Sequence, residues 1–178
     1  MKTIVIMGNS GVGKDCTIQY LSHKYHIPIA LSTTTRPMRE GEQQGREYNF
    51  VTKEEFDKYE YPIPPRVYHT VHGDWYYGTD RNVGEGKIII LDYSGTKSLC
   101  DYLGREKVSV IKLNTKVSIL LERIKNRGDN DSEMKRRLID DIEQFMGSDE
   151  YADYVVENNG IINELYQKLD WIMHKILY

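Results

Sequence analysis

The sequence has few cysteines and no long hydrophobic run. Cys16 and Cys100 are the only cysteines among 178 residues, too few for the disulfide framework that stabilises many small secreted domains. No apolar stretch approaches the roughly 20 residues that a membrane-spanning helix needs. We expect no signal peptide, because a functional motif already begins at residue 8. The sequence therefore predicts a cytoplasmic protein that does not bind membranes.

Positive charge is not in excess either. The chain carries 24 Lys and Arg residues against 27 Asp and Glu residues, a net charge of −3, which argues against general nucleic-acid or membrane-surface binding. Hydrophobic residues make up 39% and charged residues 29%, which is the balance of a folded globular protein. We expect one α/β domain over residues 1–178, a monomer or homodimer whose partners are small molecules.

What the sequence does have is a glycine-rich turn near its N-terminus. An apolar run at 3–7 precedes GNSGVGKD at 8–15, and apolar residues recur at helical spacing after it. Strand, glycine-rich turn and helix form the context of a phosphate-binding P-loop, whose backbone N–H groups converge on a polyphosphate at the helix N-terminus. Lys14 would bring its ammonium to the β- and γ-phosphates. The alternative is a glycine-rich turn with a surface lysine, and six matching positions in this context favour phosphate binding.

The end of this motif departs from the usual pattern. A P-loop normally continues from its lysine into Ser or Thr, whose hydroxyl holds Mg²⁺, whereas this chain continues with Asp15, Cys16 and Thr17. Bound Mg²⁺ keeps several waters, so a carboxylate at this position can reach the metal directly or through water. We therefore predict Asp15 as a metal ligand.

The hydrophobic pattern of the rest of the chain predicts alternating strands and helices. Beyond the first strand, we expect a short apolar return at 28–31 and further core strands at 87–92, 108–113 and 153–156. We expect helices at 14–26, 96–103, 114–127, 133–146 and 161–176. Between them, residues 48–79 read as a small, mostly β insertion that contains a capping box at Thr52–Glu55.

Three further segments carry candidate functional side chains, each with a plainer alternative. The polar stretch 32–47 places two arginines three residues apart, which suits a phosphate monoester, although a surface loop has the same composition. Asp92 ends an apolar strand where ligands bind in open α/β sheets, and capping of the next helix is equally compatible with it. Arginines at 123, 127, 136 and 137 describe either a lid that closes on phosphates or a solvated helix face.

Taken together, these motifs resemble the guanylate kinases, a family of P-loop nucleoside monophosphate kinases, over nearly the whole chain. The resemblance lies in GNSGVGK at 8–14, Ser32 to Glu42, Gly45 to Val51, Tyr76 to Thr79, Asp92, Arg123-x-x-x-Arg127-Gly128, Arg137-Leu138 and Val156-x-Asn158. It implies an α/β three-layer P-loop fold with a parallel five-stranded core sheet at 1–31, 80–122 and 138–178. It also implies a nucleotide-monophosphate-binding region at 32–79 and a helical lid at about 123–137.

The resemblance also assigns roles to individual residues. It implies Mg²⁺-dependent transfer of the ATP γ-phosphate to GMP or dGMP. The expected ATP-binding residues are Asn9, Ser10, Gly11, Val12, Gly13, Lys14, Asp15, Cys16 and Asn158, the last near the adenine. The expected acceptor-binding residues are Ser32, Arg36, Arg39, Glu42, Tyr48, Tyr77, Thr79 and Asp92. The expected catalytic residues are Lys14, Arg36, Arg123, Arg127 and Arg137, and the expected metal ligands are Asp15 and Asp92, directly or through water.

One departure from the family concerns the acceptor base. The family reads guanine with a glutamate in the strand before Tyr76-Tyr77-Gly78, and the corresponding stretch at 66–72 contains no acid. Guanine could instead be held by Ser32, Thr70 or backbone carbonyls. Two alternatives therefore stay open: a kinase of another acceptor, such as ribose 1,5-bisphosphate or a different nucleotide, and a catalytically inactive guanylate-kinase-like binding module.

Overall fold

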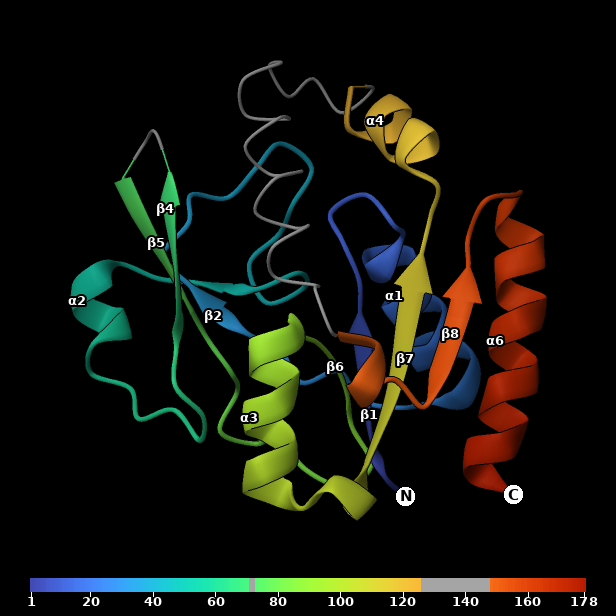
Figure 1. Ribbon diagram of the computed structural model, residues 1–178. Helices are drawn as coiled ribbons and strands as arrows, with labels where there is room; N and C mark the ends of the chain where they lie inside the picture. The colour runs from blue at the N-terminus through green and yellow to red at the C-terminus, as the bar shows by residue number, and fades with distance from the viewer. Residues whose placement is uncertain (71–72, 126–147) are drawn as a thin grey trace.

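The computed structural model describes residues 1–70, 73–125 and 148–178. Their strands form two sheets (Figure 1). The larger sheet has the strand order β6-β1-β7-β8, and its neighbouring strands are parallel. Its strands are β1 (Thr3–Met7), β6 (Ile88–Ile90), β7 (Val108–Asn114) and β8 (Tyr154–Glu157). All five residues of β1 are buried, as expected for a central strand covered on both faces.

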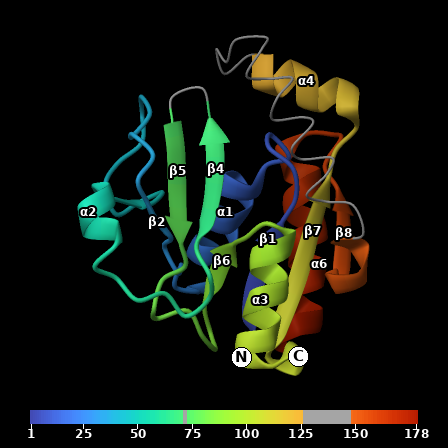
Figure 2. The ribbon, with the colours of Figure 1, turned by 60° about the vertical axis from the view of Figure 1, so that its left-hand side comes forward.

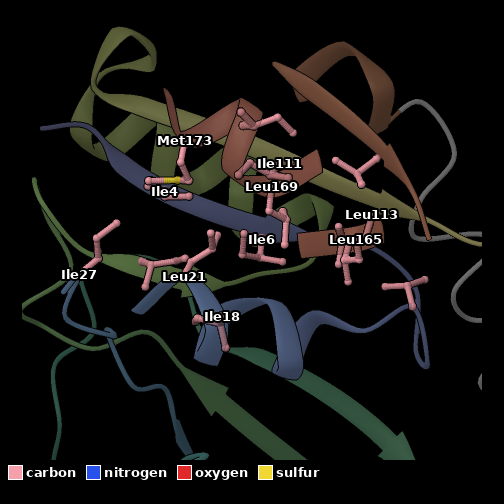
Figure 3. Packing of buried hydrophobic residues seen from close by; sticks show 14 of the residues in the cluster. Ile4, Ile6, Ile18, Leu21, Ile27, Ile111, Leu113, Leu165, Leu169 and Met173 are labelled. Carbon is pink, nitrogen blue, oxygen red and sulfur yellow. The ribbon is translucent and has the colours of Figure 1, made fainter. Parts of the chain in front are cut away.

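Helices cover both faces of this sheet and make the three-layer α/β architecture that the sequence predicted. They are α1 (Lys14–Tyr25), α3 (Tyr93–Leu103) and α6 (Ile162–Leu177). Helix α4 (Val117–Lys125) lies beyond the carboxyl end of β7 (Figure 1), and short 3₁₀ turns occur at Arg105–Lys107 and Ser148–Tyr151. The side chains of β1 alternate between the two faces. Ile4 and Ile6 pack against α1 and α6 (Figure 3), whereas Val5 and Met7 belong to the cluster that α3 covers.

The apolar return at 28–31, the candidate for the fifth strand of the expected core sheet, is reduced to a single parallel bridge between Ile29 and Ile88. Two hydrogen bonds flank this bridge, from the Ala30 N–H to the Ile88 carbonyl and from the Ile88 N–H to the Pro28 carbonyl. Pro28 has no N–H to extend the ladder, and by Thr33 the chain already pairs in the second sheet. The segment is therefore too short to form a strand.

The second sheet has the strand order β3-β2-β5-β4. Its strands are β2 (Thr33–Thr34), β3 (Asn49–Phe50), β4 (Arg66–Thr70) and β5 (Gly73–Gly78), and α2 (Lys53–Phe56) follows β3. Three of its strands lie in residues 48–79, which were predicted to be mostly β, whereas β2 lies in the stretch 32–47, which was predicted to be a loop. Thr52 and Glu55 form the predicted capping box of α2. Strands β4 and β5 pair antiparallel and lie on the β6 side of the core sheet (Figure 2).

Two expectations from composition can be compared with the structure. Cys16 and Cys100 are both free, as predicted, and burial raises the pKa of each thiol above its usual value. Within the described part of the chain, no helix has both the length and the apolar character to cross a bilayer.

Gly8, between β1 and the glycine-rich turn, is a position where any side chain would collide. Its φ is 149°, and an added Cβ would lie 2.5 Å from the Leu113 carbonyl oxygen. We expect Gly8→Ala to lower the free energy of unfolding by about 2 kcal/mol or more, because the backbone of β7 has to move. Chemical denaturation measures this change. Gly84→Ala is the control, since nothing lies within 4 Å of its added Cβ. An equal loss in both variants would contradict the close approach at Gly8.

Candidate active site

A cavity of about 260 Å³ lies between the glycine-rich turn and the second sheet. The turn and the carboxyl end of β6 contribute one side of it, and β4 and β5 contribute the other. It brings together many of the residues that the sequence nominated. Those that line it are Ser10, Gly11, Gly13, Lys14, Asp15, Ser32, Arg39, Tyr48, Tyr77, Thr79 and Asp92. These predicted nucleotide-binding residues therefore share one space, although their individual roles stay predictions, and the predicted acceptor-binding residues Arg36 and Glu42 do not line it.

The glycine-rich turn wraps around the ammonium of Lys14. Its Nζ donates to the carbonyl oxygens of Gly8 and Asn9, both at 2.8 Å, so these carbonyls point inward. Gly11 and Gly13 have φ values of 80° and 101°, a left-handed conformation that other residues rarely adopt. Helix α1 begins at Lys14, directly after Gly13. The positive end of α1 and the ammonium therefore lie at the same point, as an anion site requires.

Two residues from distant elements support this turn. The Nδ2 atom of Asn158, a residue only 5% exposed, donates to the Val12 carbonyl at 2.8 Å. A Cβ on Gly13 would lie 2.9 Å from the same Nδ2. From α4, the Arg123 guanidinium donates to the Gly11 carbonyl at 3.4 Å and to the Asn158 carbonyl at 3.2 Å. Arg123 and Asn158 thus both donate hydrogen bonds to carbonyl oxygens of the turn.

Other predicted ATP-binding residues do not line the cavity. Val12 is buried in the core, and the Cys16 thiol donates to the Gly13 carbonyl at 3.1 Å. Asn9 contributes the carbonyl that Lys14 binds, and Asn158 contacts Val12 as described. The proximity of Asn158 to an adenine stays a prediction. Arg127 and Arg137, with the rest of the predicted lid beyond residue 125, lie outside the described residues.

A buried ion pair organises the polar segment after β2. Arg36 is only 4% exposed, and its two terminal nitrogens donate to the two carboxylate oxygens of Glu42 at 3.0 and 2.8 Å. Glu42 also accepts from the Arg39 backbone N–H at 2.7 Å. The guanidinium lies 5.5 Å from the ring centroid of Tyr48 and 5.4 Å from that of Phe50. Arg36 and Glu42 therefore fix the loop from which Arg39 and Tyr48 face the cavity.

Asp92 both caps a helix and lines the cavity, so the two sequence interpretations are not exclusive. Its Oδ1 accepts from the Gly95 N–H at 2.7 Å, and so α3 begins at residue 93 rather than at 96. Its Oδ2 accepts from the Tyr68 hydroxyl at 2.9 Å and lies 3.1 Å from Arg66 Nε. Among the described residues, no group of three or more His, Cys, Asp or Glu side chains converges as a metal site. Metal ligation by Asp92 stays a prediction.

The sequence analysis missed several cavity residues, chiefly Arg66, Tyr68 and Trp75 of the β4–β5 hairpin. The signal that could have found them is the period of two in β4. Arg66, Tyr68 and Thr70 are half-buried, whereas Val67 and His69 between them are exposed. One face of this strand therefore turns toward the cavity and carries a positive side chain where the sequence analysis had looked for an acid.

The Glu42 carboxyl makes the stability of the loop after β2 depend on pH. Burial alone would raise the pKa of this group, but the hydrogen bonds from Arg36 and from the Arg39 N–H hold it below its usual value of 4.5. The contribution of a depressed acid is complete above its unfolded pKa and is lost as the pH falls through the folded one. We therefore expect Glu42→Gln to lower the free energy of unfolding by about 2 kcal/mol at pH 7.

This difference between wild type and Glu42→Gln should shrink as the pH falls below about 4.5. Urea denaturation between pH 3 and pH 7 measures it. Glu40→Gln changes an exposed acid of the same loop and should stay within about 0.5 kcal/mol of wild type. A Glu42→Gln deficit that is unchanged at low pH would show that the charge of Glu42 is not its source.

Comparisons with known proteins agree with this geometry. The family model described as guanylate kinase matches residues 1–176. A guanylate kinase of Helicobacter pylori is 34% identical over 169 residues, covering 89% of this chain and 80% of that protein. A guanylate kinase of Hydrogenovibrio crunogenus is 31% identical over 164 residues, covering 87% and 78%. The crystal structure of guanylate kinase from Anaplasma phagocytophilum superposes with a TM-score of 0.66 at 22% identity, over 98% of this chain and 85% of that one. The chain therefore belongs to the guanylate kinase family.

Proposed function

We propose that this chain transfers the γ-phosphate of ATP to GMP or dGMP. The observation that carries the proposal is that a single cavity is bounded by an anion-binding turn and by a second sheet with aromatic and basic side chains. A polyphosphate at the turn and a monophosphate nucleotide at the sheet would share this cavity. Membership of the guanylate kinase family supports the reaction, and the geometry supports the division into two ends.

The ATP phosphates are proposed to lie at the glycine-rich turn. There the first N–H groups of α1 and the ammonium of Lys14 offer donors to one point. Arg123, already hydrogen-bonded to the turn, adds a guanidinium beside it. Arg127 and Arg137 lie outside the described residues and stay predicted contributors.

Mg²⁺ is proposed to bind beside the same phosphates. Asp15 is exposed and lines the cavity directly after Lys14, so its carboxylate offers the oxygen ligand that this ion prefers. Mg²⁺ is commonly held by one or two carboxylates together with substrate phosphates and waters, and it needs no larger protein cluster. When bound, it would neutralise charge on the β- and γ-phosphates. Asp92 is a second candidate ligand for Mg²⁺, although Arg66 and Tyr68 already contact its Oδ2 atom.

The acceptor monophosphate is proposed to bind at the loop that Arg36 and Glu42 stabilise. Arg39 and Tyr48 line the cavity from this loop, and Tyr77 joins them from β5. The Tyr48 ring lies edge-on to the Tyr77 ring, with centroids 5.7 Å apart. Burial raises the pKa of the Tyr48 hydroxyl well above its usual value, so it stays protonated and donates hydrogen bonds to a phosphate at neutral pH.

Phosphoryl transfer between these two ends needs alignment and neutralisation of charge more than covalent participation by the protein. Lys14 and Arg123 would supply positive charge from the turn, and Arg39 from the acceptor loop. Exclusion of water would matter as much, because water competes with the acceptor for the γ-phosphate.

We also propose a cytoplasmic location, which the two free thiols support.

The direct test measures ADP release with GMP, dGMP, IMP, AMP, UMP, CMP and ribose 1,5-bisphosphate as acceptors. We expect GMP and dGMP to be substrates and ribose 1,5-bisphosphate to be inert. Phosphorylation of ribose 1,5-bisphosphate alone would replace the proposed acceptor. ATP binding without transfer to any acceptor would favour a binding module instead.

Lys14→Ala tests the assignment of the glycine-rich turn. Removing the ammonium should lower kcat for GMP by about 10²-fold or more, because charge that develops on the transferred group loses a preorganised partner. Steady-state kinetics measure this loss, and circular dichroism checks the fold. Lys2→Ala removes an exposed lysine and is the matched control. Unchanged turnover in Lys14→Ala would refute the phosphate-binding role of the turn.

A further inference from the structure

Strand β4 presents an arginine to the acceptor side of the cavity. Arg66 is paired with Tyr77 of β5, and Tyr77 is in turn paired with Thr34 of β2. Arg66 therefore lies on a row that runs across the second sheet. It lines the cavity together with Tyr68 and Trp75, whereas Val67 is 39% exposed on the opposite face of the strand. The guanidinium and the aromatic rings thus form one wall.

The orientation of the Arg66 guanidinium is fixed from one side. Asp92 Oδ2 lies 3.1 Å from Nε, and the same oxygen accepts from the Tyr68 hydroxyl. The other oxygen of Asp92 is held by the N-terminal turn of α3 through Gly95. Within residues 1–70, 73–125 and 148–178, neither terminal nitrogen of Arg66 has a hydrogen-bond partner. The carboxylate thus aims the guanidinium while its terminal fork remains available to a ligand.

At this wall, the Arg66 guanidinium can donate hydrogen bonds to a ligand, whereas the nearest acceptor, Asp92, is already engaged. Asp92 already accepts a backbone N–H and a hydroxyl and faces a cation, so most of its acceptor capacity is engaged. Asp15, the other acid that lines the cavity, belongs to the glycine-rich turn at the opposite side. A ligand edge placed against the Arg66 guanidinium therefore binds by offering acceptors, because this group only donates.

Among the purine bases, the edge that carries O6 and N7 matches this demand. Guanine presents the two acceptors O6 and N7 side by side, which an arginine fork can bind in bidentate fashion. Hypoxanthine presents the same two atoms and lacks only the 2-amino group. Adenine presents N7 beside a donor, the 6-amino group, so one of the two arginine N–H groups would face another donor.

We propose that Arg66 selects 6-oxopurine monophosphates by donating from its terminal nitrogens to O6 and N7, with Asp92 and Tyr68 as positioning residues. The inference rests on the proposed nucleotide kinase function and names how its acceptor is read. It differs from recognition through the 2-amino group in one measurable way. A site that reads O6 and N7 accepts IMP nearly as well as GMP, and it discriminates against AMP.

The experiment compares kcat and KM for GMP, IMP and AMP in wild type, Arg66→Lys and Arg66→Gln. In wild type, kcat/KM for IMP should lie within about tenfold of that for GMP, and that for AMP about 100-fold lower, since a bidentate pair discriminates by about 5- to 150-fold. Arg66→Lys keeps a charge beside Asp92 and loses the planar fork. It should raise KM for GMP and IMP by about tenfold or more, while kcat and KM for ATP stay within about threefold.

Controls separate this role from a structural one. Val67→Ala alters the opposite face of the same strand and should leave all three KM values unchanged. Thermal unfolding of each variant reports whether the fold is retained, and Arg66→Gln should remove the preference for GMP over AMP. A KM for GMP that is unchanged in Arg66→Lys would overturn the inference.

A wild-type preference for GMP over IMP of about 100-fold or more would also overturn it, because the 2-amino group would then be read by an acceptor. In either case the GMP kinase activity itself would stand. Absence of turnover with both GMP and IMP in wild type would instead remove the proposed function and this inference with it.

Discussion

The structure depends on the close approach of the glycine-rich turn to the ends of β7 and β8. Gly8 leaves no room for a side chain beside the Leu113 carbonyl, and Gly13 leaves none beside the Asn158 amide. Such a tight turn exposes backbone carbonyls that need partners. Lys14, Asn158 and Arg123 supply those partners from three different elements. These contacts fix the conformation of the turn without a bound ligand.

On the side of the cavity that the second sheet forms, each of two arginines is paired with a carboxylate. Glu42 binds Arg36 in a bidentate pair, and Asp92 lies beside Arg66 while capping α3. In both cases the carboxylate is occupied by internal partners, and donors or aromatic rings face the cavity. The resulting wall suits a phosphate at one place and an oxygen-bearing base edge at another. A chain of net charge −3 thus presents basic side chains at one cavity.

Much of the core was predictable, because buried parallel strands and glycine-rich turns have local signals. The strand at 3–7, the start of α1 at Lys14 and the capping box at Thr52 follow from residues that are adjacent in sequence. The role of Asp92 was not decidable, since a cap and a cavity residue have the same local pattern. Arg66 was not predicted as a cavity residue because its partner Asp92 is 26 residues away in the chain. The expected fifth strand is only a single bridge because Pro28 has no N–H to continue the pairing.

The central claim is that one cavity holds a triphosphate at the glycine-rich turn and a purine monophosphate at the second sheet. A crystal structure with a bisubstrate analogue, adenosine and guanosine joined by a chain of phosphates, tests it most directly. The account predicts phosphate oxygens at the N–H groups of residues 11–15 and the guanine edge against β4. A complex in which the phosphate chain lies outside this turn, with Lys14 still bound to the carbonyls of Gly8 and Asn9, would contradict it.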